Sequence, residues 1–158
     1  MAFPVPGSPP DMSLPPFATS TYRLHHLGIL VRDLPAALVS YRTLGFTPDE
    51  PLDAPAHGIR AALVPLGGGV TLEIFTPIAD GPVRASLEKR GEGLHHVAFA
   101  VPDLASELCI LAARGVRLVD TTPRPGLHGW PVAFLHPSAA NGVLIELVQP
   151  PMTEEQLS

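Results

Sequence analysis

The sequence contains the same pair of motifs twice. Residues 25–34 (HHLGILVRDL) match residues 95–104 (HHVAFAVPDL) at an offset of 70, and residues 69–77 (GVTLEIFTP) match residues 142–150 (GVLIELVQP) at an offset of 73. Repetition at a period this long is typical of a duplicated supersecondary unit rather than of a short structural repeat. We therefore predict two copies of one module, and each copy must supply equivalent residues at equivalent places.

The first motif of each copy predicts a strand with a spacious face. Side chains alternate between the two faces of a strand, so His26 shares a face with Gly28, and its counterpart His96 shares a face with Ala98. The bulky apolar residues of both motifs point to the opposite face. Such small neighbours leave room beside each histidine for a bound group.

The second motif of each copy places a carboxylate inside an apolar run. Burying Glu73 or Glu146 without a partner would cost roughly several kcal/mol, so each requires compensation. Convergence of Glu73 and Glu146 with His26 and His96 on a divalent cation would provide it, because such ions accept imidazole nitrogen and carboxylate oxygen together. We predict this four-residue metal site.

The ligand types indicate a catalytic rather than a structural ion. Two histidines and two carboxylates leave two positions of an octahedron open for adjacent substrate oxygens, whereas a closed structural zinc site normally uses cysteine, of which the chain has one. Co²⁺, Mn²⁺, Mg²⁺, Ni²⁺, Fe²⁺ and Zn²⁺ all remain candidates.

The other histidines receive different interpretations. The alternation of the strands puts His25 and His95 on the face of the bulky residues, so we expect them to be structural. His128 lies in a glycine-hinged loop before a strand and is a candidate ligand contact. His57 is a weaker candidate of the same kind, and His136 is expected at the end of a strand.

Composition excludes several classes of protein. The chain has 158 residues, of which 46% are hydrophobic and 16% charged, and its net charge of −5 leaves no basic surface for nucleic acid. No stretch has the roughly 18 apolar residues of a membrane span, and the N-terminus lacks the pattern of a secretory signal. A single cysteine allows no disulfide within the chain, so we expect a cytoplasmic protein.

The predicted organisation is a single α+β domain at residues 22–150 between a proline-rich tail at 1–21 and a C-terminal tail at 151–158. Module 1 covers about 22–78, module 2 covers about 92–150, and each has the order βαβββ. Asp33 and Asp103 are predicted to cap the helices. The predicted short strands lie from residue 46 and over 116–120, and residues 48–57 and 121–129 are expected to be loops.

The paired βαβββ modules with one histidine and one glutamate from each half resemble the vicinal oxygen chelate superfamily, which includes glyoxalase I and extradiol dioxygenases. Residues 91–99 (GEGLHHVAF), 126–129 (GLHG), 134–137 (FLHP) and 142–147 (GVLIEL) are most similar to the methylmalonyl-CoA epimerases. The resemblance covers about residues 24–150. It implies a glyoxalase-like fold, in which the two modules form a half-open β-barrel around the metal, and a homodimer.

The resemblance also implies a reaction. A methylmalonyl thioester, or a related acyl-CoA substrate, would chelate the metal through its carboxylate and thioester oxygens, which stabilises the enolate formed when the α-proton leaves. Glu73 or Glu146 would act as a base, with His57 or a water acting on the opposite face, and His128 is a further candidate catalytic residue. Reprotonation on the other face completes the epimerisation.

One position departs from the pattern. Some epimerases of this kind carry a glutamate on the third strand, where this chain has Ala61. With a base on one face only, the same chemistry would give a glyoxalase I-like isomerase or a tailoring lyase or isomerase. A resistance protein that merely binds a small molecule is a third alternative, and it would not need the four metal ligands.

Overall fold

A computed structural model describes residues 22–152, so the predicted proline-rich tail at 1–21 and residues 153–158 of the C-terminal tail lie outside the described range. The two modules form one eight-stranded sheet in the order β2-β3-β4-β1-β5-β8-β7-β6. The strands are β1 (Arg23–Leu30), β2 (Leu52–Ala54), β3 (Ile59–Pro65), β4 (Thr71–Pro77), β5 (Gly93–Ala100), β6 (Arg124–Pro125), β7 (Pro131–Leu135) and β8 (Ile145–Val148). The helices are α1 (Leu34–Thr43), α2 (Pro82–Arg90) and α3 (Leu104–Ala113), with 3₁₀ turns at Pro55–His57, Gly67–Gly69 and Pro137–Ala140. Mixed helix and strand content with a curled sheet confirms the predicted α+β, glyoxalase-like fold.

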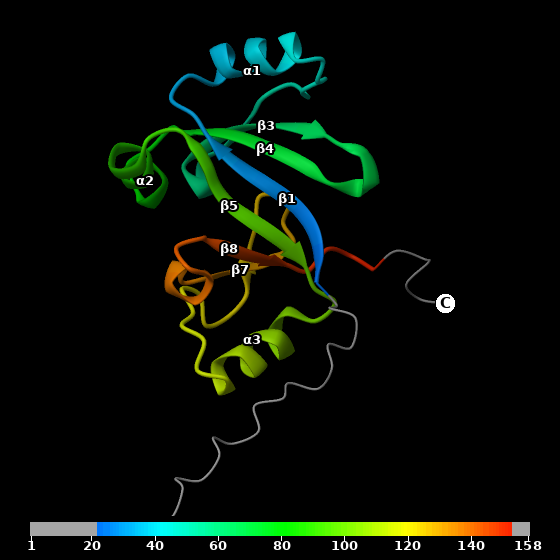
Figure 1. The fold of residues 1–158 in the computed structure, drawn as a ribbon, viewed down its shortest axis with the longest axis vertical. Helices are drawn as coiled ribbons and strands as arrows, with labels where there is room; N and C mark the ends of the chain where they lie inside the picture. The colour runs from blue at the N-terminus through cyan, green and yellow to red at the C-terminus, as the bar shows by residue number, and fades with distance from the viewer. Residues whose placement is uncertain (1–21, 153–158) are drawn as a thin grey trace, which may run out of the picture.

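The first strands of the two modules join the halves. β1 and β5 pair antiparallel at the centre of the sheet, while β1 pairs parallel with β4 and β5 pairs parallel with β8. Helices α1 and α3 lie at opposite ends of the molecule, each over its own half of the sheet (Figure 1). This arrangement gives the curled sheet a concave inner face that both modules line.

Each module has its own apolar core between its helix and the outer face of the sheet. Leu34 and Leu38 of α1 pack with Ile74 of β4, and Leu104 and Leu108 of α3 pack in the equivalent core of the second half. The bulky residues of the repeated motifs, such as Leu27 and Phe99, pack against these cores, as their alternation predicts.

The predicted helix caps are present in both modules. The Asp33 carboxylate accepts a hydrogen bond from the Ala36 backbone N–H at 2.9 Å, and the Asp103 carboxylate accepts one from the Ser106 backbone N–H at 3.0 Å. These bonds satisfy backbone donors that a helix start leaves without a partner. Each cap therefore fixes where the chain leaves a histidine-bearing strand.

The second strand of each module was placed wrongly by the sequence pattern. β2 at Leu52–Ala54 and β6 at Arg124–Pro125 lie within segments predicted to be loops, while Leu118 forms only an isolated bridge with Leu135. Both strands are short edge strands that form hairpins with the strands after them, and an edge position tolerates proline. Their pairing follows from the hairpin turns rather than from a hydrophobic pattern.

Within residues 22–152 no helix has the length and apolar character needed to cross a membrane.

Candidate metal centre and active site

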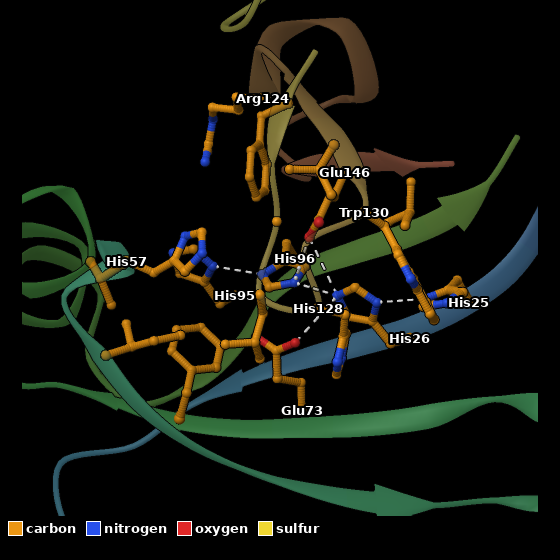
Figure 2. A pocket seen from close by; sticks show the side chains of 18 of the residues that line it. His25, His26, His57, Glu73, His95, His96, Arg124, His128, Trp130 and Glu146 are labelled. Atoms are coloured by element: carbon orange, nitrogen blue, oxygen red, sulfur yellow. Dashed lines mark hydrogen bonds and ion pairs between the residues drawn. The ribbon is translucent and has the colours of Figure 1, made fainter. Parts of the chain in front are cut away.

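The four predicted ligands meet on the inner face of the sheet. His26 comes from β1, Glu73 from β4, His96 from β5 and Glu146 from β8, and all four are buried, with exposed fractions from 4% to 7%. Figure 2 shows their polar atoms directed toward one another at the floor of a pocket. The repeat therefore brings one histidine and one glutamate from each module together, as its symmetry predicts.

The register of the sheet explains this convergence. Gly28 lies opposite Glu73 in the parallel pair β1–β4, and Ala98 lies opposite Glu146 in the parallel pair β5–β8. In the central antiparallel pair, Gly28 also lies opposite His96. The small residue of each repeat thus sits between the polar side chains of its neighbours.

Gly28 provides space that the site requires. A Cβ atom built at Gly28 would lie 2.1 Å from Cε1 and 2.4 Å from Nδ1 of His96, which is well inside van der Waals contact. The His96 imidazole therefore occupies the volume that a larger residue at position 28 would fill. The sequence predicted free space beside His26 on the face it shares with Gly28. The imidazole of His96, from the other module, fills that space.

Three of the four residues form a compact donor set. The Nε2 atoms of His26 and His96 are 3.0 Å apart, and Glu146 Oε2 lies 3.3 Å from the first and 3.1 Å from the second. Within residues 22–152 these three form the one group of histidine, cysteine or acidic side chains whose ligand atoms all lie within 4.8 Å of one another. Glu73 Oε2 lies 3.8 Å from His26 Nε2, at the edge of this group.

This donor set fits a divalent cation. Two ring nitrogens 3.0 Å apart would repel if both presented lone pairs, so either a proton or a cation must lie between them. Two imidazoles and a carboxylate are a common ligand combination for divalent transition metals. The cation would be held by His26, His96 and Glu146, while Glu73, 3.8 Å from His26 Nε2, lies outside this compact group.

Electrostatics favour ionised Glu146 beside a proton-binding histidine. Burial works against the Glu146 carboxylate, but hydrogen bonds from His26 and His96 outweigh it and lower its pKa to about 2. Burial also disfavours the His26 imidazolium, yet the hydrogen bond and charge of Glu146, together with the charge of Glu73, raise its pKa above 6.5. The ionised Glu146 carboxylate therefore favours a proton or another cation beside His26.

The placement of His25 and His95 on the outer face was wrong. Both line the pocket, with His25 Nδ1 2.8 Å from His26 Nδ1 and His95 Nδ1 2.9 Å from His96 Nδ1. The pairing of β1 with β5 skips one residue on each strand, and the skipped residues are these two histidines. A bulge of this kind adds a residue to the ladder and changes the direction of side chains. Strict alternation cannot predict it, although the doubled histidine in both repeats is a signal.

Burial and neighbouring positive charge keep His25 and His95 neutral. We call these two the outer histidines and His26 and His96 the inner histidines, because only the second pair belongs to the donor set. The pKa of His25 is lowered by burial and by His26, and the pKa of His95 is lowered to about 4 by burial, by His96 and by Arg90. A neutral imidazole keeps one nitrogen available as a hydrogen-bond acceptor.

The remaining candidates also lie around the pocket. His128 and His57 both line it, and the His128 ring packs against Trp130 with centroids 5.2 Å apart. Arg124 lies on the pocket wall over the Phe134 ring at 5.2 Å. His136 instead caps the turn at Pro137–Ala140, at the end of β7, as predicted.

Ala61 is not exposed to the pocket. It is 1% exposed and belongs to a buried apolar cluster with Leu30, Ile59 and Phe75. The chain therefore has no ionisable side chain at this position of β3.

Comparison with known proteins identifies the family. Residues 25–134 match the model of the Glyoxalase/Bleomycin resistance protein/Dioxygenase superfamily. The chain belongs to this superfamily. The matched region includes both histidines of the cluster and the segment that joins the two modules.

Several members of the superfamily are similar over most of the chain. The ethylmalonyl-CoA/methylmalonyl-CoA epimerase of Cereibacter sphaeroides is 39% identical over 131 residues, which cover 80% of this chain and 97% of that protein. A structure of a methylmalonyl-CoA epimerase in complex with methylmalonyl-CoA and NH₄⁺ has a TM-score of 0.74 at 36% identity, covering 81% of this chain and 94% of that one. The crystal structure of the methylmalonyl-CoA epimerase from Mycobacterium tuberculosis has a TM-score of 0.77 at 37% identity, covering 85% of this chain and 93% of that one.

Proposed function

We propose that this protein is an isomerase, a metal-dependent epimerase of methylmalonyl-CoA or of a related 2-carboxyacyl thioester. The observation that carries the proposal is the buried group of His26, His96 and Glu146 at the floor of an open pocket. The epimerases that resemble the chain at 35–39% identity support the reaction and the acyl-CoA substrate.

His26, His96 and Glu146 would hold the cation, with Glu73 as the fourth ligand. When bound, a divalent cation supplies Lewis-acid polarisation of the substrate oxygens and so makes the α-proton more acidic. The chain itself would provide two carboxylates, Glu146 and Glu73, against the two positive charges of the ion. Arg124 on the pocket wall is suitably charged to attract an anionic thioester.

The proton transfers require groups on both faces of the substrate. Glu73 is the better candidate for the first base, because it approaches one imidazole at 3.8 Å, whereas Glu146 is held by two imidazoles at 3.3 and 3.1 Å. His128, on the loop before β7, is our candidate for the group that exchanges a proton on the other face. In this role His128 would replace the glutamate that some epimerases carry where this chain has Ala61.

The test is α-proton exchange, followed by NMR in D₂O with (2S)- and, separately, (2R)-methylmalonyl-CoA. We expect deuterium to enter either isomer with interconversion of the two, and we expect chelation of the metal to abolish both. Replacement Glu73→Gln should slow exchange by about 10²- to 10⁴-fold, the usual contribution of a positioned base. Glu88→Gln, at an exposed position on α2, is the matched control and should leave the rate unchanged.

The outcomes separate the alternatives. Exchange without interconversion would indicate one-sided chemistry of the lyase or isomerase kind. No exchange from either isomer by metal-loaded protein would contradict the substrate assignment. We also propose a cytoplasmic homodimer, which sedimentation equilibrium of the full chain would test.

A further inference from the structure

Each histidine of the donor set is joined to the histidine that precedes it in the sequence. His26 Nδ1 lies 2.8 Å from His25 Nδ1, and His96 Nδ1 lies 2.9 Å from His95 Nδ1. Both contacts occur at the bulges that skip the outer histidine in the pairing of β1 with β5. The arrangement is therefore duplicated, like the donor set itself (Figure 2).

The chemistry of imidazole determines the direction of these two bonds. A neutral imidazole carries one N–H, and the other nitrogen is an acceptor. For His26 and His96 to present Nε2 lone pairs to a cation, each must carry its hydrogen on Nδ1. The partner nitrogens on His25 and His95 must then accept, which places the hydrogen of each outer ring on its own Nε2.

We propose that His25 and His95 are positioning residues that accept the Nδ1–H bond of the adjacent inner histidine and so fix the tautomer that presents Nε2 to the cation. This inference rests on the proposed cation site and assigns a role to two residues that do not themselves bind the ion. A metal-binding histidine usually donates its other N–H to an oxygen acceptor, and here a second imidazole takes that part.

Aromatic contacts hold the outer rings in place. The His25 ring meets the Trp130 ring edge-on at 5.7 Å between centroids, and the His95 ring meets the Phe75 ring edge-on at 5.3 Å. Each outer ring is thereby held between an aromatic neighbour and the inner histidine. An acceptor fixed in this way restricts rotation of the inner ring, which an exposed acceptor could not do.

The test compares two substitutions at each outer position. In His25→Phe and His95→Phe a ring remains but the acceptor is lost, whereas in His25→Asn and His95→Asn an amide oxygen can replace Nδ1 as acceptor. Zn²⁺ affinity is measured by competition calorimetry on the full chain. We expect the Phe variants to bind about 10- to 100-fold more weakly, the loss typical of removing an outer partner of a metal ligand. The Asn variants should recover most of the affinity.

A second readout requires no variant. Long-range ¹H–¹⁵N NMR of the Zn²⁺-loaded wild-type protein distinguishes the two tautomers of each histidine. We expect the hydrogen on Nδ1 in His26 and His96, and on Nε2 in His25 and His95.

The outcomes separate this inference from the proposed function. If the wild-type protein binds Zn²⁺ and the Phe variants bind equally well, the positioning role is wrong and the cation site stands. Asn variants as weak as the Phe variants, or hydrogens on Nε2 of the inner pair, would also overturn the positioning role. A wild-type protein that binds no Zn²⁺ would overturn both proposals.

Discussion

At the scale of single residues, the site depends on the absence of a side chain at Gly28. The His96 imidazole lies where the Cβ of any other residue at position 28 would be. The size of the residue paired with His96 on the neighbouring strand thus decides whether the His96 ring can reach the donor set.

We expect Gly28→Ala to weaken metal binding at least about tenfold, comparable with the loss of an outer partner of a ligand, because the new methyl group must displace the His96 ring. Gly67→Ala is the matched control, since a Cβ at Gly67 meets no atom within 4 Å. Calorimetric titration of both variants with Co²⁺ checks this. Equal affinities in the two variants would show that His96 does not contribute to the site.

Proton competition at His26 should make metal binding depend on pH. The pKa of His26 is raised in the metal-free protein, so part of the population carries a proton that the cation must displace. Affinity should therefore rise with pH through the folded pKa of His26, by at most about tenfold per pH unit for one proton, and level off above it. Calorimetry in buffers of different ionisation enthalpy measures the protons released. Binding at pH 7 without proton release would contradict this account of His26.

At the scale of elements, the repeated strand–helix connection fixes the direction of each histidine strand. Helices α1 and α3 each follow an aspartate whose carboxylate accepts a hydrogen bond from a backbone N–H of the first turn. This feature was predictable because an N-cap depends on residue type and local spacing. The bulges at His25 and His95 were not predictable in this way, because they arise from how two distant strands align.

We expect Asp33→Ala to lower the free energy of unfolding by about 1 kcal/mol, since the Ala36 N–H loses its acceptor. Asp33→Asn should cost little, because asparagine caps a helix about as well as aspartate. Urea denaturation of the metal-free variants, compared through their midpoints, makes the measurement. A similar loss for Asn and Ala would mean that the carboxylate charge, rather than the hydrogen bond, stabilises α1.

At the scale of the whole molecule, two copies of one module produce one site that neither contains alone. Each supplies a histidine and a glutamate, and the antiparallel pairing of β1 with β5 brings them together. The repeat in the sequence was sufficient to predict that these four side chains approach one another, and their role as metal ligands stays a prediction. It could not predict that Glu73 lies at the edge of the group, because that distance depends on the curvature of the whole sheet.

Because the site spans both modules, metal should stabilise the whole domain. Free Co²⁺ at 100 times its Kd should raise the free energy of unfolding by about 2.7 kcal/mol. Glu146→Gln should lose most of this gain, while Glu88→Gln, outside the site, should keep it. Thermal unfolding with and without Co²⁺ checks the expectation. An equal gain in both variants would place the ion elsewhere.

The most direct test of the central claim is a crystal structure of the Co²⁺-loaded protein with anomalous data collected at the cobalt edge. Our account predicts one strong anomalous peak within bonding distance of His26 Nε2, His96 Nε2 and a carboxylate oxygen of Glu146. A saturated protein whose only peak lies away from these three residues would contradict it, and the repeated histidines and glutamates would then need a different explanation.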